Sequence, residues 1–344
     1  MKTLKFLLIA CLKRSPKATR KTGGFTLIEL LVGVILAFLV ITPLLGFMVN
    51  IMNTDRQEQA KTNSDQELQA ALDYINRDVQ QAVYIYDKDG VDAIRSQLPE
   101  AAEMTPVLVF WKRKLVEKSN PINPIDPADC RPAPTATTTG CNDAFVYSLV
   151  AYYLIKDQST TWSKAARIGR FEIHDGVRKA DGDYVDPIPN NSRVARSPDF
   201  QAFDLTQGET LAEKMNNWKT ESQSNTNYDT ADLPESNILV DYIDQTNTTD
   251  NPNLPSEAEV CPDTAVGTDP GWTQVPNYNV VSDTFKTYSF YTCVYSSKNT
   301  ARVFLRGNAL ARIEKNNYTY NAQKSAFFPK ARLEVRGTGV LSND

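Results

Sequence analysis

The most strongly patterned part of the sequence is a long apolar run from Phe25 to Met52, in which Glu29 is the single charged residue. A helix of this length can cross the roughly 30 Å of hydrocarbon in a bilayer. Pro43 lies inside the run, where its missing N–H group frees a backbone carbonyl and permits a bend. We therefore predict a membrane-spanning helix over residues 25–52, bent near Pro43.

Apolar residues continue after this run at helical spacing, with charged residues on the other faces. The apolar positions are Leu68, Leu72, Ile75, Val79 and Val83. We expect the same helix to continue over residues 53–86 as an amphipathic half, with one face packed on a globular head. The polar residues Asp87–Gly90 are typical of a helix end.

The pattern changes from helical to strand-like after Gly90. Seven segments are rich in β-branched and aromatic residues: 107–112, 145–155, 166–173, 238–243, 285–295, 301–305 and 331–335. Long polar stretches over residues 119–140, 185–230 and 245–278 are expected to form loops. We predict an α+β protein in which one long N-terminal helix packs on an antiparallel β-sheet head over residues 91–344. A division of this head into two subdomains stays open.

Composition narrows the possible functions. The chain of 344 residues has a net charge of -4, which provides no general basic surface, so we expect no nucleic-acid partner. A single histidine removes most Ser-His-Asp, Cys-His and multi-histidine metal sites. No arrangement of residues indicates catalysis, so we expect a protein that is not an enzyme and has no cofactor and no metal.

Charge is distributed unevenly along the chain. Residues 1–24 contain seven Lys or Arg and no acidic residue, whereas acidic residues outnumber basic ones in the remainder. Because positively charged flanks stay on the cytoplasmic side of a span, the head is expected on the outer side. This predicts a single-pass membrane protein whose basic N-terminal segment is cytoplasmic.

The junction before the apolar run differs from a secretory signal, in which small residues follow a short apolar core. Here the basic residues and a glycine pair come first. The segment Gly24-Phe25-Thr26-Leu27-Ile28-Glu29 resembles the class III signal of type IV prepilins and type II secretion pseudopilins. This resemblance implies that a prepilin peptidase cuts between Gly24 and Phe25, removes residues 1–24 as a leader, and methylates the new amine. It also implies a pilin-like fold and a place in the inner (cytoplasmic) membrane, with the leader cytoplasmic and the head periplasmic.

Glu29 is notable without any resemblance, since a carboxylate inside a membrane span costs roughly 2 to 3 kcal/mol unless it is paired. Helix geometry places the Phe25 amine one turn away from Glu29. We expect Glu29 to neutralise the Phe25 amine of the adjoining subunit as subunits stack. The alternatives are a plain, uncut signal anchor that tolerates one acid, and a lipobox that would make Cys11 a lipidated terminus.

Further segments narrow the resemblance. Residues 66–82 and 237–243 are similar to J-type minor pseudopilins and W-type minor pilins. Residues 151–156 and 303–313 resemble C-type pseudopilins of cyanobacterial hormogonium polysaccharide secretion. The resemblance implies a minor pseudopilin, located at or near the tip of a type IV pilus-like filament that supports polysaccharide secretion and gliding motility.

The same resemblance implies a set of partners. These are the prepilin peptidase/N-methyltransferase, other major and minor pseudopilins, an inner-membrane assembly platform with its ATPase, membrane lipid and exported polysaccharide. Three alternatives stay open: a W-type minor pilin of an adhesive or DNA-uptake pilus, a membrane-anchored glycan-acting enzyme, and an anchored adhesin with an uncut N-terminus. The enzyme requires two carboxyls roughly 5 to 10 Å apart in a cleft.

Four cysteines remain once Cys11 leaves with the leader, and they permit three pairings. We favour Cys130 with Cys141, which closes a short loop, and Cys261 with Cys293, which ties a long loop to a strand. The spacing does not match CxxC metal sites, so disulfides in an oxidising compartment are the preferred interpretation.

Two acidic segments, residues 87–92 and 181–186, resemble pieces of calcium loops without the full pattern, and we expect polar turns there. His174 is expected at a strand end.

Overall fold

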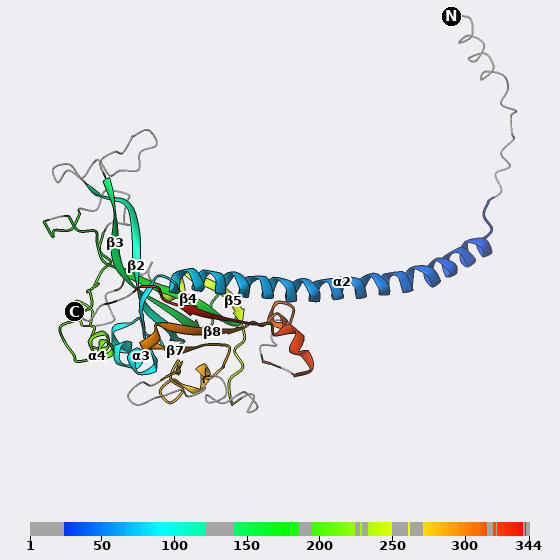
Figure 1. Cartoon of the computed structure of the whole chain (residues 1–344). Coiled ribbons are helices and arrows are strands. Elements are labelled where there is room, and N and C mark those ends of the chain that lie inside the picture. Colours follow the sequence, from blue (N-terminus) through cyan, green and yellow to red (C-terminus); the bar gives the residue numbers. More distant parts are fainter. Residues whose placement is uncertain are drawn as a thin grey trace, which may run out of the picture. The chain divides into compact units, whose positions relative to one another are not determined.

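The computed structural model (Figure 1) describes residues 24–121, 141–179, 181–185, 195–223, 228, 233–249, 261, 271–314, 319–320, 322–339 and 341. Over these residues the protein is α+β, with a long apolar N-terminal helix and antiparallel sheets. Contacts divide the chain into two compact units, one ending at Asp55 and the other beginning at Arg56.

Helix α2 (Leu27–Val79) begins in the first unit. Every residue from Gly24 to Gln59 is exposed, and the helix is long and apolar enough to cross a membrane. The apolar side chains of residues 25–52 face outward on all sides of the helix, a pattern that is typical of a helix with apolar surroundings. The helix is unbroken at Pro43, and the bend expected there stays a prediction.

The part of α2 in the second unit buries one face against the head. Its buried residues are Ala60, Ser64, Leu68, Ala71, Leu72, Ile75, Asp78 and Val79. Burial of Leu68, Leu72, Ile75 and Val79 confirms the face that the apolar spacing predicts. The expectation that charged residues occupy the other faces is wrong for Asp78, because hydrogen bonds from three strands compensate its burial. Gly307 packs so closely on this face that a Cβ atom there would lie 2.8 Å from Ser64 Oγ. The close approach of helix and head therefore requires glycine at position 307.

The helix ends earlier than its spacing predicts. Residues 82–85 form strand β1 (Ala82–Ile85), in which all four side chains are buried. Asp87 does not end a helix but caps the start of α3 (Lys88–Ile94), accepting a hydrogen bond from the Gly90 N–H group at 2.9 Å. The prediction of helix up to residue 86 is wrong, because a short run buried on both faces gives the same apolar pattern in a strand as in a helix.

The first sheet has the order β1-β2-β3-β4-β5 and is antiparallel throughout. Its further strands are β2 (Met104–Pro121), β3 (Cys141–Ile155), β4 (Ala166–His174) and β5 (Ile238–Ile243). All four of these strands were predicted, and β2 extends well beyond the expected segment. Strands β2 and β3 pair from Met104 and Ile155 out to Pro121 and Cys141, which makes a long ribbon.

The second sheet has the order β6-β7-β8-β9 and is also antiparallel. Its strands are β6 (Thr273–Val275), β7 (Phe290–Tyr295), β8 (Thr300–Arg306) and β9 (Lys330–Arg336). Strand β6 lies in a stretch expected to be loop, and only the second half of the predicted segment 285–295 is a strand. The sequence predicts one sheet, whereas the structure has two that share one hydrophobic core with α2.

Short helices complete the described head. They are α4 (Leu211–Asn216), η1 (Arg95–Gln97), η4 (Pro234–Ser236), η5 (Asp283–Phe285), η6 (Ser296–Lys298), η7 (Leu310–Arg312) and η8 (Ala322–Phe327). Polar contacts join the sheets inside the core. Thr292 on β7 donates to the Val107 carbonyl on β2 at 2.8 Å. Arg306, at the end of β8, pairs with the buried Asp244 just after β5 at 2.6 Å.

Candidate functional site

The predicted cleavage segment, residues 24–29, leads into the first turn of α2, and all of its residues are exposed. Gly24 and Phe25 precede the helix, and Phe25 is 85% exposed. The Glu29 carboxylate accepts hydrogen bonds from the Thr26 N–H group at 3.3 Å and the Thr26 hydroxyl at 3.2 Å. In return the Glu29 N–H group donates to Thr26 Oγ1 at 3.3 Å. Thr26 and Glu29 therefore form a capping box, which closes the helix N-terminus.

This capping box was missed in the sequence, although the Thr-x-x-Glu spacing that signals it is present. A negative charge in the first helical turn is favoured by the helix dipole, and the reciprocal bonds satisfy backbone donors that a helix start leaves unpaired. Glu29 thus has partners in its own turn in the isolated chain. Since the carboxylate is exposed, an amine of another chain can reach it without rearrangement of the fold.

The last turn of α2 is fixed to the first sheet by a buried acid. Asp78 accepts hydrogen bonds from Lys112 on β2 at 2.5 Å, from the Tyr152 hydroxyl on β3 at 2.8 Å and from Arg170 on β4 at 2.9 Å. A buried carboxylate is tolerated only when charge and hydrogen bonds compensate its lost hydration. Here three adjacent strands supply that compensation to a single helical residue.

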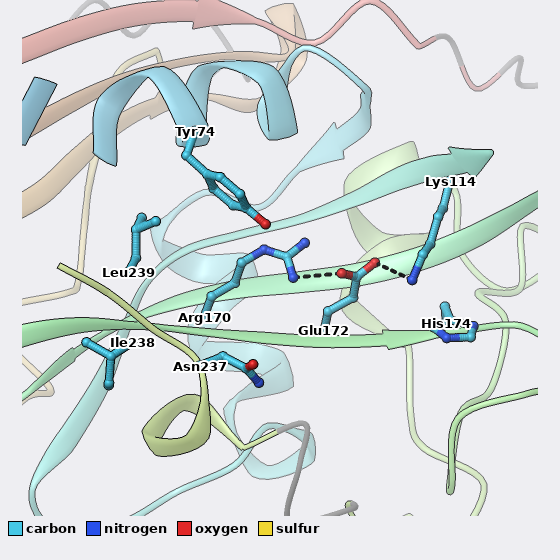
Figure 2. Close-up of a pocket in the computed structure, with 8 residues that line it drawn as sticks. All are labelled: Tyr74, Lys114, Arg170, Glu172, His174, Asn237, Ile238 and Leu239. Atoms are coloured by element: carbon cyan, nitrogen blue, oxygen red, sulfur yellow. Dashed lines mark ion pairs between the residues drawn. The ribbon is translucent and has the colours of Figure 1, made fainter. Parts of the chain in front are cut away.

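A cavity of about 400 Å³ opens beside this cluster and is lined by residues of α2, β2, β4 and the start of β5. Figure 2 shows Glu172 between Arg170 and Lys114, with the Tyr74 ring above them and His174 further along β4. Glu172 pairs with Arg170 at 2.7 Å and with Lys114 at 3.3 Å. Glu172 therefore forms ion pairs with two basic residues that line the cavity, Arg170 and Lys114.

Burial and neighbouring charges determine the protonation states of Glu172 and His174, which line this cavity. Burial alone would raise the pKa of the Glu172 carboxyl, but Arg170, Lys112 and Lys114 outweigh it and hold that pKa well below its usual range. Burial, with the nearby Lys114 charge, lowers the pKa of His174. At neutral pH Glu172 is therefore ionised and His174 is neutral. Among the residues that the structure describes, Glu172 is the one carboxylate that lines this cavity, and these residues do not supply the acid pair that glycoside hydrolysis uses.

The structure places the candidate cysteines as follows. Cys261 and Cys293 form a disulfide with a Cα–Cα distance of 5.6 Å, which ties residue 261 to strand β7. Cys141 is the first residue of β3, while Cys130 lies outside the described residues, so their pairing stays a prediction.

The remaining acidic segments take part in local structure. Asp183 donates its N–H group to Asp181 Oδ1 at 3.1 Å in a turn, and Asp87 caps α3. His174 is the last residue of β4. Within the part of the chain that the structure describes, no group of three or more His, Cys, Asp or Glu side chains could hold a metal ion.

The described residues therefore hold two separate candidate features. One is the exposed turn at the start of α2 in the first unit, and the other is the buried charge cluster that joins the end of α2 to the head within the second unit. Comparison with known protein families, with characterised proteins and with solved structures found no match to this chain.

Proposed function

We propose that the protein is a minor pseudopilin, a structural component without enzymatic activity, of a type IV pilus-like or type II secretion-like system. One observation carries the proposal. The segment from Gly24 to Glu29 starts a helix whose first half is apolar and exposed on every side, and whose second half packs on an α+β head. This order of leader, apolar helix and antiparallel head is compatible with a pilin-like architecture.

In this proposal α2 has two environments. Before assembly its apolar half lies in lipid of the inner membrane, with the head in the periplasm. During assembly that half packs against the equivalent helices of other major and minor pseudopilins, and the exposed apolar surface passes from lipid to protein. The prepilin peptidase/N-methyltransferase, the assembly platform and its ATPase act on the chain in that order.

The capping box gives Glu29 a defined role in both environments. While the subunit waits in the membrane, Thr26 satisfies the carboxylate within the same turn. When a neighbouring subunit brings its methylated Phe25 amine close, the Glu29 carboxylate gains a positively charged partner in a water-poor interior. Opposite charges attract strongly in such low-dielectric surroundings, so the ion pair favours the assembled state and fixes the register.

The cluster around Asp78 connects α2 to the head while the subunit is moved from the membrane into the filament. A force that lifts α2 reaches the first sheet through Lys112, Tyr152 and Arg170 as well as through the apolar face. The sequence resemblance supports a position at or near the filament tip and a role in polysaccharide secretion and gliding motility, with the exported polysaccharide as cargo.

Mass spectrometry of the N-terminus of the purified chain tests this proposal. We expect a chain that begins with N-methylated Phe25. Replacing Gly24 by a larger residue, as in Gly24→Trp, should leave the leader attached, whereas Gly23→Ala should be processed normally. A wild-type protein that keeps Met1 or its basic leader in cells with an active prepilin peptidase would contradict the proposal.

A further inference from the structure

The outward face of the second sheet carries an ordered row of aromatic and basic side chains. Tyr291 on β7 lies directly opposite Phe304 on β8, and Phe304 lies directly opposite Arg332 on β9. In the next row Arg306 lies opposite Lys330. Directly opposite residues on one face of a sheet have their Cβ atoms about 5 Å apart, so these side chains form one continuous surface.

The charges of this face are only partly compensated. Arg302 pairs with Glu334 at 2.7 Å, and Arg306 pairs with Asp244 at 2.6 Å. Lys330 and Arg332 are both exposed, and neither has an acidic partner among the residues that the structure describes. Because they are two positions apart on one strand, both point to the same side of the sheet. The face therefore presents two unpaired positive charges side by side.

These cations border a cavity with an aromatic floor. The cavity holds about 440 Å³ and is lined by Tyr288, Tyr291, Phe304, Arg306, Lys330 and Arg332, together with two apolar residues of the strands. The rings of Tyr291 and Phe304 are stacked, with centroids 4.6 Å apart, and the Tyr288 ring meets Tyr291 edge-on at 5.6 Å. Within the described part of the chain, no acidic residue lines the cavity. Its volume is within the range of small-ligand sites.

We propose that this surface, the aromatic-basic face of β7, β8 and β9, binds an acidic sugar unit of a carboxylated glycan. The apolar C–H face of the sugar lies on the aromatic floor, and its carboxylate accepts hydrogen bonds from Arg332 and Lys330. Aromatic rings offer a large apolar contact area, and hydrogen bonds between ionised partners are the stronger ones. The site thus selects a ligand that is both anionic and apolar on one side.

The low density of positive charge on this face favours a carboxylated sugar (a uronate) over nucleic acid as the ligand. Nucleic acids carry a phosphate at every nucleotide, and proteins bind them with extended basic grooves. This face offers two unpaired cations on a chain whose net charge is -4, and Glu334 and Asp244 lie at its border. A glycan with one carboxylate on a bulky sugar unit matches two adjacent cations without forcing further negative charge against these acids.

Calorimetric titration of the full chain in detergent micelles tests the site with three probes. These are a short oligogalacturonate, a neutral oligogalactose of equal length, and a single-stranded oligonucleotide of equal charge. We expect the oligogalacturonate to bind roughly tenfold or more tightly than either of the others. Lys330→Gln with Arg332→Gln should abolish this preference. Lys219→Gln with Arg336→Gln, which removes the same charge from exposed positions outside the cavity, should keep it.

A second variant keeps the test decisive if the double variant folds poorly by circular dichroism. Phe304→Leu removes the ring without changing charge and should weaken oligogalacturonate binding. Equal affinity for the neutral probe, tighter binding of the oligonucleotide, or wild-type affinity in the Phe304→Leu or the Lys330→Gln/Arg332→Gln protein would overturn the proposal. The site goes beyond the assembly role and does not depend on it, because binding is measured on the head of an unassembled chain and processing at its N-terminus.

Discussion

At the scale of single residues, Asp78 illustrates what the sequence does and does not reveal. Asp78 carries a charge, yet it is buried on the helix face that packs on the head. Its partners Lys112, Tyr152 and Arg170 lie on three different strands. In the sequence, Lys112 is 34 residues from Asp78, Tyr152 is 74 residues away and Arg170 is 92 residues away. No local pattern marks such a cluster, because it exists only once the strands have paired.

Replacing Asp78 by Asn should be strongly destabilising. The substitution leaves Lys112 and Arg170 buried with reduced compensation, and breaking one side of a buried ion pair costs about 3 to 5 kcal/mol. Thermal unfolding followed by circular dichroism measures the loss. The matched control is Asp73→Asn, an exposed acid of the same helix, which should change the midpoint little. Equal effects of the two variants would show that the cluster contributes nothing to stability.

The lowered pKa of Glu172 predicts how the stability of the head depends on pH. The pKa of its carboxyl is lower in the folded chain than the ordinary value of 4.5, so the folded state favours the ionised form. Near this pH the folded chain therefore binds fewer protons at Glu172 than the unfolded chain does. This contribution is fully present above about pH 4.5 and is lost as pH falls through the folded pKa.

Thermal midpoints of the wild type and Glu172→Gln, measured between neutral pH and pH values well below 4.5, test this dependence. We expect the wild type to lose more stability on acidification than the variant does. Parallel pH profiles for the two proteins would contradict the assignment.

At the scale of elements, α2 was predictable where its pattern is long and periodic. The face of Leu68, Leu72 and Ile75 is buried as expected, since period and length both favour a helix. The end of the helix was not predictable, because Val83 continues the helical spacing yet lies in β1. The split into two sheets was not predictable either, since pairing between distant strands decides it.

The close contact between α2 and the segment after β8 gives a test at this scale. Gly307→Ala would place its new methyl group 2.8 Å from Ser64 Oγ and 3.1 Å from Leu68 Cδ1. Overpacking of this kind typically costs about 1 to 3 kcal/mol. In a Ser64→Ala background the hydroxyl is absent, so the same substitution should cost less. Additive effects of the two substitutions on the unfolding midpoint would show that this contact does not limit the packing.

At the scale of the whole molecule, the sequence predicted an apolar helix followed by a mixed head, because the two parts differ in composition. Residues 1–23 of the predicted leader lie outside the described residues, so the leader stays a prediction. The capping box of Thr26 and Glu29 was readable in the sequence and was overlooked. The aromatic-basic face of β7, β8 and β9 was not readable, since Tyr291, Phe304 and Arg332 come together only through strand register. Local signals therefore describe the N-terminal segment well and the surfaces of the head poorly.

The proposed assembly depends most on Glu29 as the partner of an adjoining subunit's N-terminal amine. The direct measurement is the amount of Glu29→Gln protein in filaments sheared from cells, relative to the amount in the membrane fraction. We predict normal membrane insertion and exclusion from filaments, because the neutral amide cannot compensate the amine. Glu58→Gln, an exposed acid of the same helix that pairs with Lys61, should enter filaments normally. Glu29→Gln protein in filaments at the wild-type level would contradict the account.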